Sequence, residues 1–209
     1  MKNARSRKAW IRGHINDFFV KQANKEGYRS RAAYKLIEIS KRDNLLKPGM
    51  TIVDLGASPG GWSQVAANKI GLNGKVFSLD ILEMKALPGV TFIQGDFEEE
   101  STLTELREKL EGRSIDLVIS DMSPNISGIV MSDQARCMYL AELALRFSMA
   151  QLNSGGNFLV KVFQGSGFEQ FMNTMRLSFQ QVVTRKPKAS RDRSNEIYLL
   201  GLKKHGKVP

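Results

Sequence analysis

The stretch Thr51–Trp62, TIVDLGASPGGW, decides the fold, because it joins a buried strand to a helix through a glycine-rich turn. Its first three residues are β-branched and lead into Asp54, a pattern typical of a short buried strand that ends in an acid. The following GWSQVAANKI predicts a helix, with Ser58 as its N-cap and Pro59 in its first position. Such a corner lets a ligand approach bare backbone at a helix N-terminus.

The glycine spacing excludes two familiar nucleotide loops. Gly56, Gly60 and Gly61 are spaced G-x-x-x-G-G, whereas the dinucleotide fingerprint is G-x-G-x-x-G and the P-loop ends in G-K-[ST]. The carboxylate of Asp54 would repel a phosphate on the same loop, but it suits a ligand that carries positive charge. The loop resembles the first motif of S-adenosylmethionine (SAM)-dependent methyltransferases. The alternative is an ordinary strand-to-helix turn with structural glycines.

Length and composition indicate one α/β domain with a substantial core. The chain has 209 residues, 42% hydrophobic and 25% charged. It has no apolar run of the ~20 residues that a bilayer requires and no secretory signal, so we expect a cytoplasmic protein. Cys137 is the one cysteine and the chain has two histidines, so we expect neither a disulfide framework nor a metal site. We expect a monomer.

The net charge of +10 is concentrated near the N-terminus. Residues 1–50 hold 13 Lys/Arg against 4 Asp/Glu, and the remaining residues hold 18 against 17. A basic arm on a nearly neutral domain is typical of a nucleic-acid partner. An anionic membrane is the alternative, but the arm lacks a sustained apolar face flanked by lysines. We therefore expect a basic RNA-binding extension over residues 1–26 and the catalytic domain over residues 27–209.

Alternating helix and strand patterns predict a Rossmann-like, doubly wound, mostly parallel sheet of seven strands, with functional residues at the strands' C-terminal ends. We expect a broken helix over residues 10–25 and a helix over 31–43 capped by Ser30. Gly155 and Gly156 are expected to end the long helix before the fifth strand. The remaining predicted helices cover 61–70, 103–110, 132–152 and 168–179, and the strands cover 51–54, 75–80, 90–93, 115–120, 157–162, 181–185 and 196–202.

Acidic residues follow successive strands at Asp54, Asp80, Asp96 and Asp121. Each alone could be an ordinary loop carboxylate. Asp80 lies where Rossmann-like folds hold ribose hydroxyls, roughly 20 residues beyond the glycine turn. Four acids around one crevice favour a nucleoside-type ligand.

Three charged residues in the two halves of the chain are candidates for chemistry. Lys161 ends an apolar strand, where a lysine is costly unless it is paired or used. Lys35 lies on the inward face of its predicted helix, and Glu196 begins the last strand. A solvated helix lysine and an edge charge are the structural alternatives for Lys35 and Glu196.

Five motifs occur along the chain, which are, in order, DLG-x-x-PGGW, QGDF, SDM-x-PN, VKVFQG and SR-x-R-S-x-E-x-Y. With these motifs the chain resembles the FtsJ family of RNA 2′-O-ribose methyltransferases. The resemblance runs from about residue 27 to residue 200. Ser58 and Ser123 stand where relatives carry alanine. The resemblance implies a class I methyltransferase fold whose last strand is antiparallel, with SAM as cofactor and no metal.

The family's Lys-Asp-Lys-Glu tetrad corresponds to Lys35, Asp121, Lys161 and Glu196. With the acid and glycine of the first motif, the implied cofactor-binding residues are Asp54, Gly56, Gly60, Trp62, Asp80, Asp96 and Asp121. The implied substrate is a uridine of large-subunit (23S-type) rRNA in the peptidyl-transferase A-loop, free or in a 50S-type particle. The alternatives are methylation of the tRNA anticodon loop and a non-catalytic ribosome-assembly factor on the same fold.

The residues fit this chemistry. Methyl transfer is an in-line displacement, so positioning of the 2′-hydroxyl supplies much of the acceleration. A ribose hydroxyl is a poor nucleophile and gains from a group that removes or polarises its proton. We therefore expect Lys161 to act as base or oxyanion partner, with Asp121 and Glu196 orienting it and Lys35.

Overall fold

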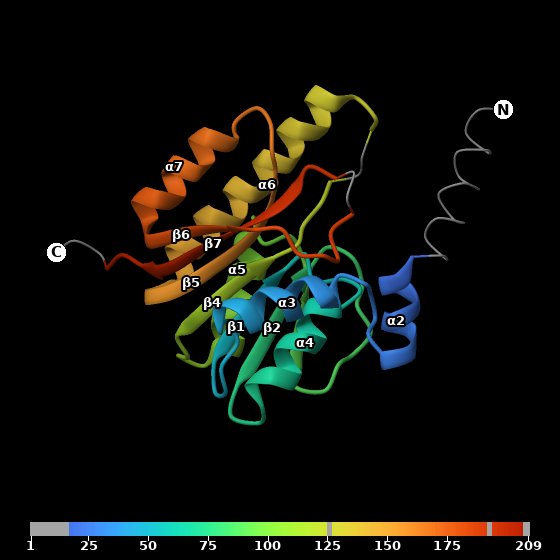
Figure 1. The fold of residues 1–209 in the computed structure, drawn as a ribbon. Helices are drawn as coiled ribbons and strands as arrows, with labels where there is room; N and C mark the ends of the chain where they lie inside the picture. Colours follow the sequence, from blue (N-terminus) through green and yellow to red (C-terminus); the bar gives the residue numbers. More distant parts are fainter. Residues whose placement is uncertain (1–16, 125–126, 192–193, 207–209) are drawn as a thin grey trace.

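A computed structural model describes residues 17–124, 127–191 and 194–206, and shows a twisted seven-stranded sheet between two layers of helices (Figure 1). The strand order is β3-β2-β1-β4-β5-β7-β6. β7 runs antiparallel to its neighbours β5 and β6, and the other neighbouring pairs are parallel, which confirms the predicted fold class. The strands are β1 (Thr51–Leu55), β2 (Lys75–Asp80), β3 (Val90–Gln94), β4 (Ile115–Ser120), β5 (Leu152–Phe163), β6 (Phe179–Arg185) and β7 (Glu196–Lys204).

The helices divide between the two faces of the sheet, as the alternation of side chains along β1 shows. Val53 and Leu55 pack on the face covered by α5, α6 and α7, whereas Ile52 packs on the face covered by α3 and α4. α2 lies outside this second layer, with the ring of Phe19 5.5 Å from that of Tyr34 on α3. The helices are α2 (Phe18–Glu26), α3 (Ala33–Asp43), α4 (Gly61–Ile70), α5 (Glu100–Leu110), α6 (Val130–Gln151) and α7 (Phe168–Ser178).

The predicted cap of α4 is wrong. The N-cap is Gly60, whose left-handed conformation (φ 104°) brings its carbonyl within 2.9 Å of the N–H of Gln64. Ser58 instead donates its backbone N–H to Asp80 Oδ2 at 2.8 Å and its hydroxyl to the carbonyl of Glu83 at 3.2 Å. Ser58 and Pro59 therefore belong to the turn before the helix, and they tie that turn to the end of β2.

Two further predicted boundaries are wrong. α3 begins at Ala33 without a side-chain cap, and Ser30 contributes only its carbonyl, which accepts from the N–H of Ala33. Gly155 and Gly156 do not end α6, because they lie inside β5, which begins at Leu152. The pairing of β4 with β5 shifts register at this point, and Gly155 has a φ of 79°, so the glycines accommodate a bulge.

At the N-terminus, the predicted broken helix is partly described: α2 begins at Phe18, and residues 10–16 lie outside the described residues. Asp17 is its N-cap and accepts from the N–H groups of Phe19 and Val20. Asp17 also forms an ion pair with Arg31, so the described part of the basic arm is fastened to the domain. No helix in the described ranges is long and apolar enough to cross a membrane.

Candidate active site

The end of β2 forms one side of a cavity. Asp80 accepts the backbone N–H of Ser58 through Oδ2 and that of Leu82 through Oδ1, each at 2.8 Å. Each carboxylate oxygen retains a second lone pair for a ligand hydroxyl. The turns after β1 and β2 are thereby fixed relative to each other at the C-terminal edge of the sheet.

The cavity has a volume of about 630 Å³, within the range for a nucleoside-sized ligand. Asp80, Asp96 and Asp121 line it, together with Gly56, where a Cβ would lie 2.3 Å from Met122 Cγ. The charged lining consists of four carboxylates and one cation, Arg136, and the apolar lining includes Leu79, Met122 and Leu143. This combination fits a ligand with ribose hydroxyls, an aromatic base and positive charge, as SAM has.

Three predicted cofactor residues lie outside this lining in the described part of the chain. Asp54 is buried on the α4 side of β1 and accepts from Ser63 Oγ at 2.6 Å. Burial raises the pKa of Asp54 to about 7. Trp62 donates its indole N–H to the carbonyl of Ala32 at 2.8 Å, and Gly60 forms the α4 cap.

The predicted catalytic residues Lys35, Asp121, Lys161 and Glu196 come together at the same sheet edge. Lys35 Nζ lies 2.7 Å from Glu196 Oε1 and 3.9 Å from Asp121 Oδ1. Lys161 Nζ lies 3.2 Å from Asp121 Oδ1 and donates to the Asp121 carbonyl at 2.6 Å. Asp121 thus contacts both lysines and also lines the cavity, which joins the tetrad to the cofactor-sized space.

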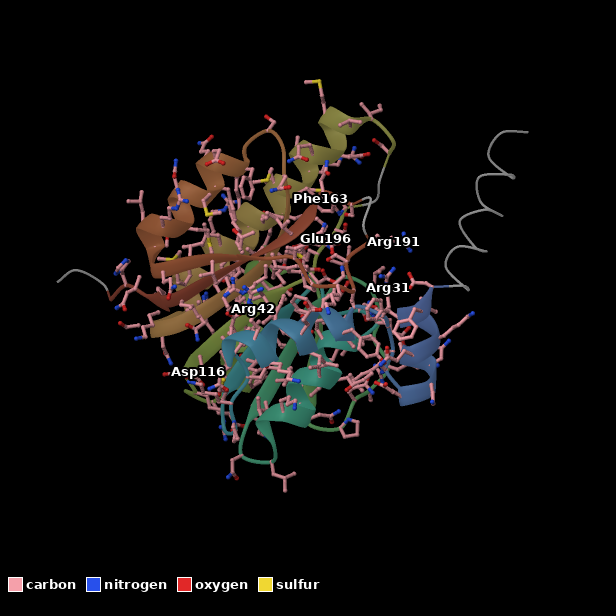
Figure 2. The ribbon with its side chains drawn as sticks, in the orientation of Figure 1. Arg31, Arg42, Asp116, Phe163, Arg191 and Glu196 are labelled. Carbon is pink, nitrogen blue, oxygen red and sulfur yellow. The ribbon has the colours of Figure 1, made fainter. Side chains whose placement is uncertain are left out.

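Strand alternation explains how the tetrad is assembled. Lys161 shares a face of β5 with Leu159, which packs in the core under α3 and α4, and Lys35 comes from α3 itself. Glu196 begins β7 opposite Phe163, and Figure 2 shows both labelled residues close together at this edge. Arg31 and Arg191 lie on the α2 side of Glu196 in the same view.

Tyr198 is the residue of this network that sequence reasoning missed. Its hydroxyl lies 2.7 Å from Asp121 Oδ1 and 3.3 Å from Glu196 Oε1, and it accepts from Lys35 Nζ at 2.9 Å. Burial raises the pKa of Tyr198 well above its usual value, and the two carboxylates raise it further. Tyr198 was part of the quoted SR-x-R-S-x-E-x-Y motif, where its two-residue spacing from Glu196 on a strand could have indicated a shared face.

The surroundings of Glu196 keep this carboxyl ionised. Burial works to raise its pKa, but the ammonium of Lys35 and hydrogen bonds from Lys35 and Ser190 outweigh burial and hold the pKa below its usual value. The arrangement is therefore a nearly buried, alternating set of cations and anions around one tyrosine hydroxyl. Such a set fixes the position of Lys161 Nζ, to which a substrate hydroxyl can be brought. Among the described residues, no group of three or more His, Cys, Asp and Glu is arranged to hold a metal.

Comparison with known proteins connects this site to methyltransferases. The model of the family described as FtsJ-like methyltransferase matches residues 28–204. The protein called "Ribosomal RNA large subunit methyltransferase E" in Nitrosospira multiformis is 67% identical over 204 residues, 98% of this chain and 99% of that protein. The protein of the same name in Chromobacterium violaceum is 58% identical over 201 residues, 96% of this chain and 98% of that protein.

Solved structures agree with this comparison. A crystal structure described as a ribosomal RNA methyltransferase, from Plasmodium falciparum, has a TM-score of 0.76 at 32% identity, covering 86% of this chain and 100% of that chain. An rRNA-methylase structure from Clostridium thermocellum has a TM-score of 0.56 at 20% identity, covering 82% of this chain and 97% of that chain. The second likeness supports the fold alone.

Proposed function

This chain belongs to the FtsJ-like methyltransferase family, and on that premise we propose that it methylates a ribose 2′-hydroxyl of large-subunit ribosomal RNA. The observation that carries the proposal is the position of Asp121. This residue lines a nucleoside-sized cavity and also contacts Lys35 and Lys161, so a cofactor and a catalytic cluster meet at one carboxylate. A binding factor without activity has no use for this junction.

The names of the relatives support ribosomal RNA over the tRNA anticodon loop as substrate. The uridine of the A-loop remains a prediction. It is tested by mass mapping of 2′-O-methylated nucleotides in rRNA and tRNA from cells with and without this protein. We expect one uridine of the large-subunit rRNA to lose its methyl group, whereas a loss confined to tRNA would refute the rRNA assignment.

We propose that Asp80 accepts the adenosine ribose hydroxyls of SAM and that Asp96 lies beside the adenine. When bound, SAM supplies an electrophilic methyl group. Gly56 and Asp121 complete the contact surface, and both line the cavity with Asp80 and Asp96. Three residues act on the cofactor indirectly. Gly60 and Trp62 shape the turn after β1 and the start of α4, and Asp54 contributes negative charge from the end of β1.

In the proposed mechanism, Lys161 Nζ meets the 2′-hydroxyl as the hydroxyl oxygen attacks: as a neutral amine it would take up the hydroxyl proton, and as an ammonium it would donate a hydrogen bond to the oxyanion. Asp121 holds Lys161 Nζ through both its carboxylate and its carbonyl. Glu196 holds Lys35, and Tyr198 links the two carboxylates. Because these contacts already hold the lysines and carboxylates in place, little reorganisation is required when RNA arrives. The division into an RNA-binding extension (residues 1–26) and a methyltransferase domain (27–209) is part of this proposal, and the charge distribution supports it.

Asp80→Ala is expected to weaken SAM binding by roughly tenfold, because one charge-assisted hydrogen-bonded contact to the ligand is lost. Isothermal calorimetry measures the affinity. The substitution also removes acceptors for the N–H groups of Ser58 and Leu82, so Asp80→Asn, which keeps one acceptor, is the matched control. Unchanged SAM affinity in Asp80→Ala would remove Asp80 from the cofactor site.

SAM affinity is expected to rise as the pH increases from 6 to 8. Asp54, with its pKa raised to about 7 by burial, is largely neutral at pH 6 and ionised at pH 8. A cationic ligand nearby favours the ionised carboxylate, so the dissociation constant should fall with pH, by at most about tenfold per pH unit for one linked proton. The Asp54→Asn variant should show a flatter dependence. An equal slope in the two proteins would assign the proton to another group.

A further inference from the structure

Three successive large apolar side chains are exposed at the start of α6. Ile129, Val130 and Met131 have exposed fractions of 66%, 82% and 84%, and we call them the apolar tip. Leu72 and Leu177, elsewhere on the surface, are exposed singly. A contiguous exposed apolar group next to a functional site typically marks an interaction surface.

The apolar tip is held in a defined position. The carboxylate of Asp133 accepts the N–H and the hydroxyl of Ser127 at 2.8 and 2.7 Å, and the N–H of Gly128 at 2.9 Å. The N–H of Asp133 in turn donates to the carbonyl of Ile129. One carboxylate therefore fixes the turn that presents the tip, so its exposure is built into the fold.

The apolar tip lies one helical turn before a residue of α6 that contacts the sheet edge of the catalytic cluster. It belongs to the segment that leaves β4 through Asp121, and Met122 and Pro124 of that segment line the cavity. Gln134, one turn into α6, donates to the carbonyl of Phe163 at the end of β5. Figure 1 shows the first turns of α6 extending beyond the ends of the strands. An RNA strand that reaches Lys161 over the first turns of α6 therefore meets the tip.

The target hydroxyl has to reach a group with little exposure, since Lys161 is only 8% accessible. A ribose inside a stacked, paired RNA segment cannot come that close, so the nucleotide must be unstacked first. Apolar side chains that enter the space between bases are a known way to keep a nucleic acid open. Base faces accept apolar contacts without sequence preference, whereas phosphates need cations.

We propose that the apolar tip contacts the face of the base next to the target nucleotide and holds the RNA open there. The proposal rests on the proposed function, because it requires an RNA substrate. The tip takes the place of the stacking partner that the extruded target leaves. This role concerns access of the substrate, and the tetrad performs the chemistry.

The test uses the I129A/V130A/M131A variant on a protein-free large-subunit rRNA fragment with 2-aminopurine beside the target. With wild type we expect 2-aminopurine fluorescence to rise on binding, and with the variant we expect this rise to be lost. Single-turnover methylation should fall about 10- to 30-fold on the structured fragment and stay near wild type on an unpaired oligonucleotide of the same sequence. The L72A/L177A variant, which removes two other exposed leucines, should behave as wild type.

Asp133→Ala keeps the apolar side chains but removes the anchor of their turn, and it should lower the rate on the structured fragment several-fold. If the triple variant matches wild type on the structured fragment, or is slowed equally on the unpaired oligonucleotide, the proposal is overturned. A loss seen only on ribosomal particles would assign the tip to a ribosomal protein and also overturn it. If wild type methylates only large-subunit particles, the fluorescence measurement on the fragment decides, and equal signals from wild type and the triple variant overturn the proposal. If wild type methylates neither RNA nor the particles, the proposed function itself fails.

Discussion

Lys161→Ala is expected to lower single-turnover methylation by about 10²-fold or more, the usual scale for a positioned acid–base group. SAM and RNA affinities should stay near wild type, because in the proposed function the cavity holds SAM and the basic arm holds RNA. Lys161 Nζ, on β5, contacts the carbonyl and carboxylate of Asp121, which follows β4, and the proposed mechanism brings the reacting hydroxyl to this point. Rapid-quench measurements, with wild type and variant both saturated with SAM and RNA, give the rate constant of the methyl-transfer step.

Two controls separate chemistry from stability. Lys161→Arg should not restore the rate, because a guanidinium does not give up its proton and has a different shape. Lys204→Ala removes another nearly buried lysine, which donates to the carbonyls of Met149 and Leu152 at the opposite end of the sheet. It should lower the melting temperature without slowing methylation by the folded protein. Full activity in Lys161→Ala, or methylation of RNA with a 2′-deoxy target, would refute the mechanism.

The sheet could be predicted from the sequence, because the spacing of apolar residues changes clearly between the strands and the helices. The strand ranges that begin at Thr51, Lys75 and Ile115 agree closely with the structure. The tetrad came from motif resemblance, and the structure brings its four members together. The resemblance gave residue identities, whereas the order of the strands explains why residues from α3, β5 and β7 meet.

The details of the turns were less accessible, because they depend on contacts between distant segments. Ser58 looked like a helix cap, but Asp80 and Glu83 compete for its N–H and hydroxyl. The Gly155-Gly156 pair looked like a helix end. Its role depends on the pairing of β5 with β4, and this pairing cannot be predicted from the local sequence. Local sequence indicates which residues can adopt caps, turns or bulges. Tertiary contacts determine which of these structures each residue forms.

Asp54 shows a different limit. Its position at the end of an apolar run favoured a direct ligand contact, but it shares a face of β1 with Ile52, which packs towards α4. Alternation along the strand therefore turns its carboxylate away from the cavity lining. Tyr198 is the converse case: a side chain that looks like core from sequence becomes the link between two carboxylates, because its ring is buried while its hydroxyl reaches the cluster.

Removal of residues 1–16 is expected to weaken RNA binding about 10²- to 10³-fold near physiological salt. The segment carries five Lys/Arg and no Asp/Glu, and each lost phosphate contact lowers the slope of log K against log salt by about 0.7 for single-stranded RNA. The slope should therefore flatten by up to about 3.5. SAM affinity should stay near wild type.

The truncation point matters, because the arm is not uniform. Asp17 caps α2 and pairs with Arg31, and Phe19 contacts Tyr34, so a deletion that includes α2 would disturb the domain as well as the charge. A full-length variant with the five basic residues replaced by glutamine separates charge from length. If both variants keep the wild-type salt slope, the basic excess serves another partner, and sedimentation with vesicles that contain an anionic lipid tests the membrane alternative. If the truncated protein loses affinity and the glutamine variant does not, the arm acts through its backbone or apolar side chains, and counterion release is not the source of binding.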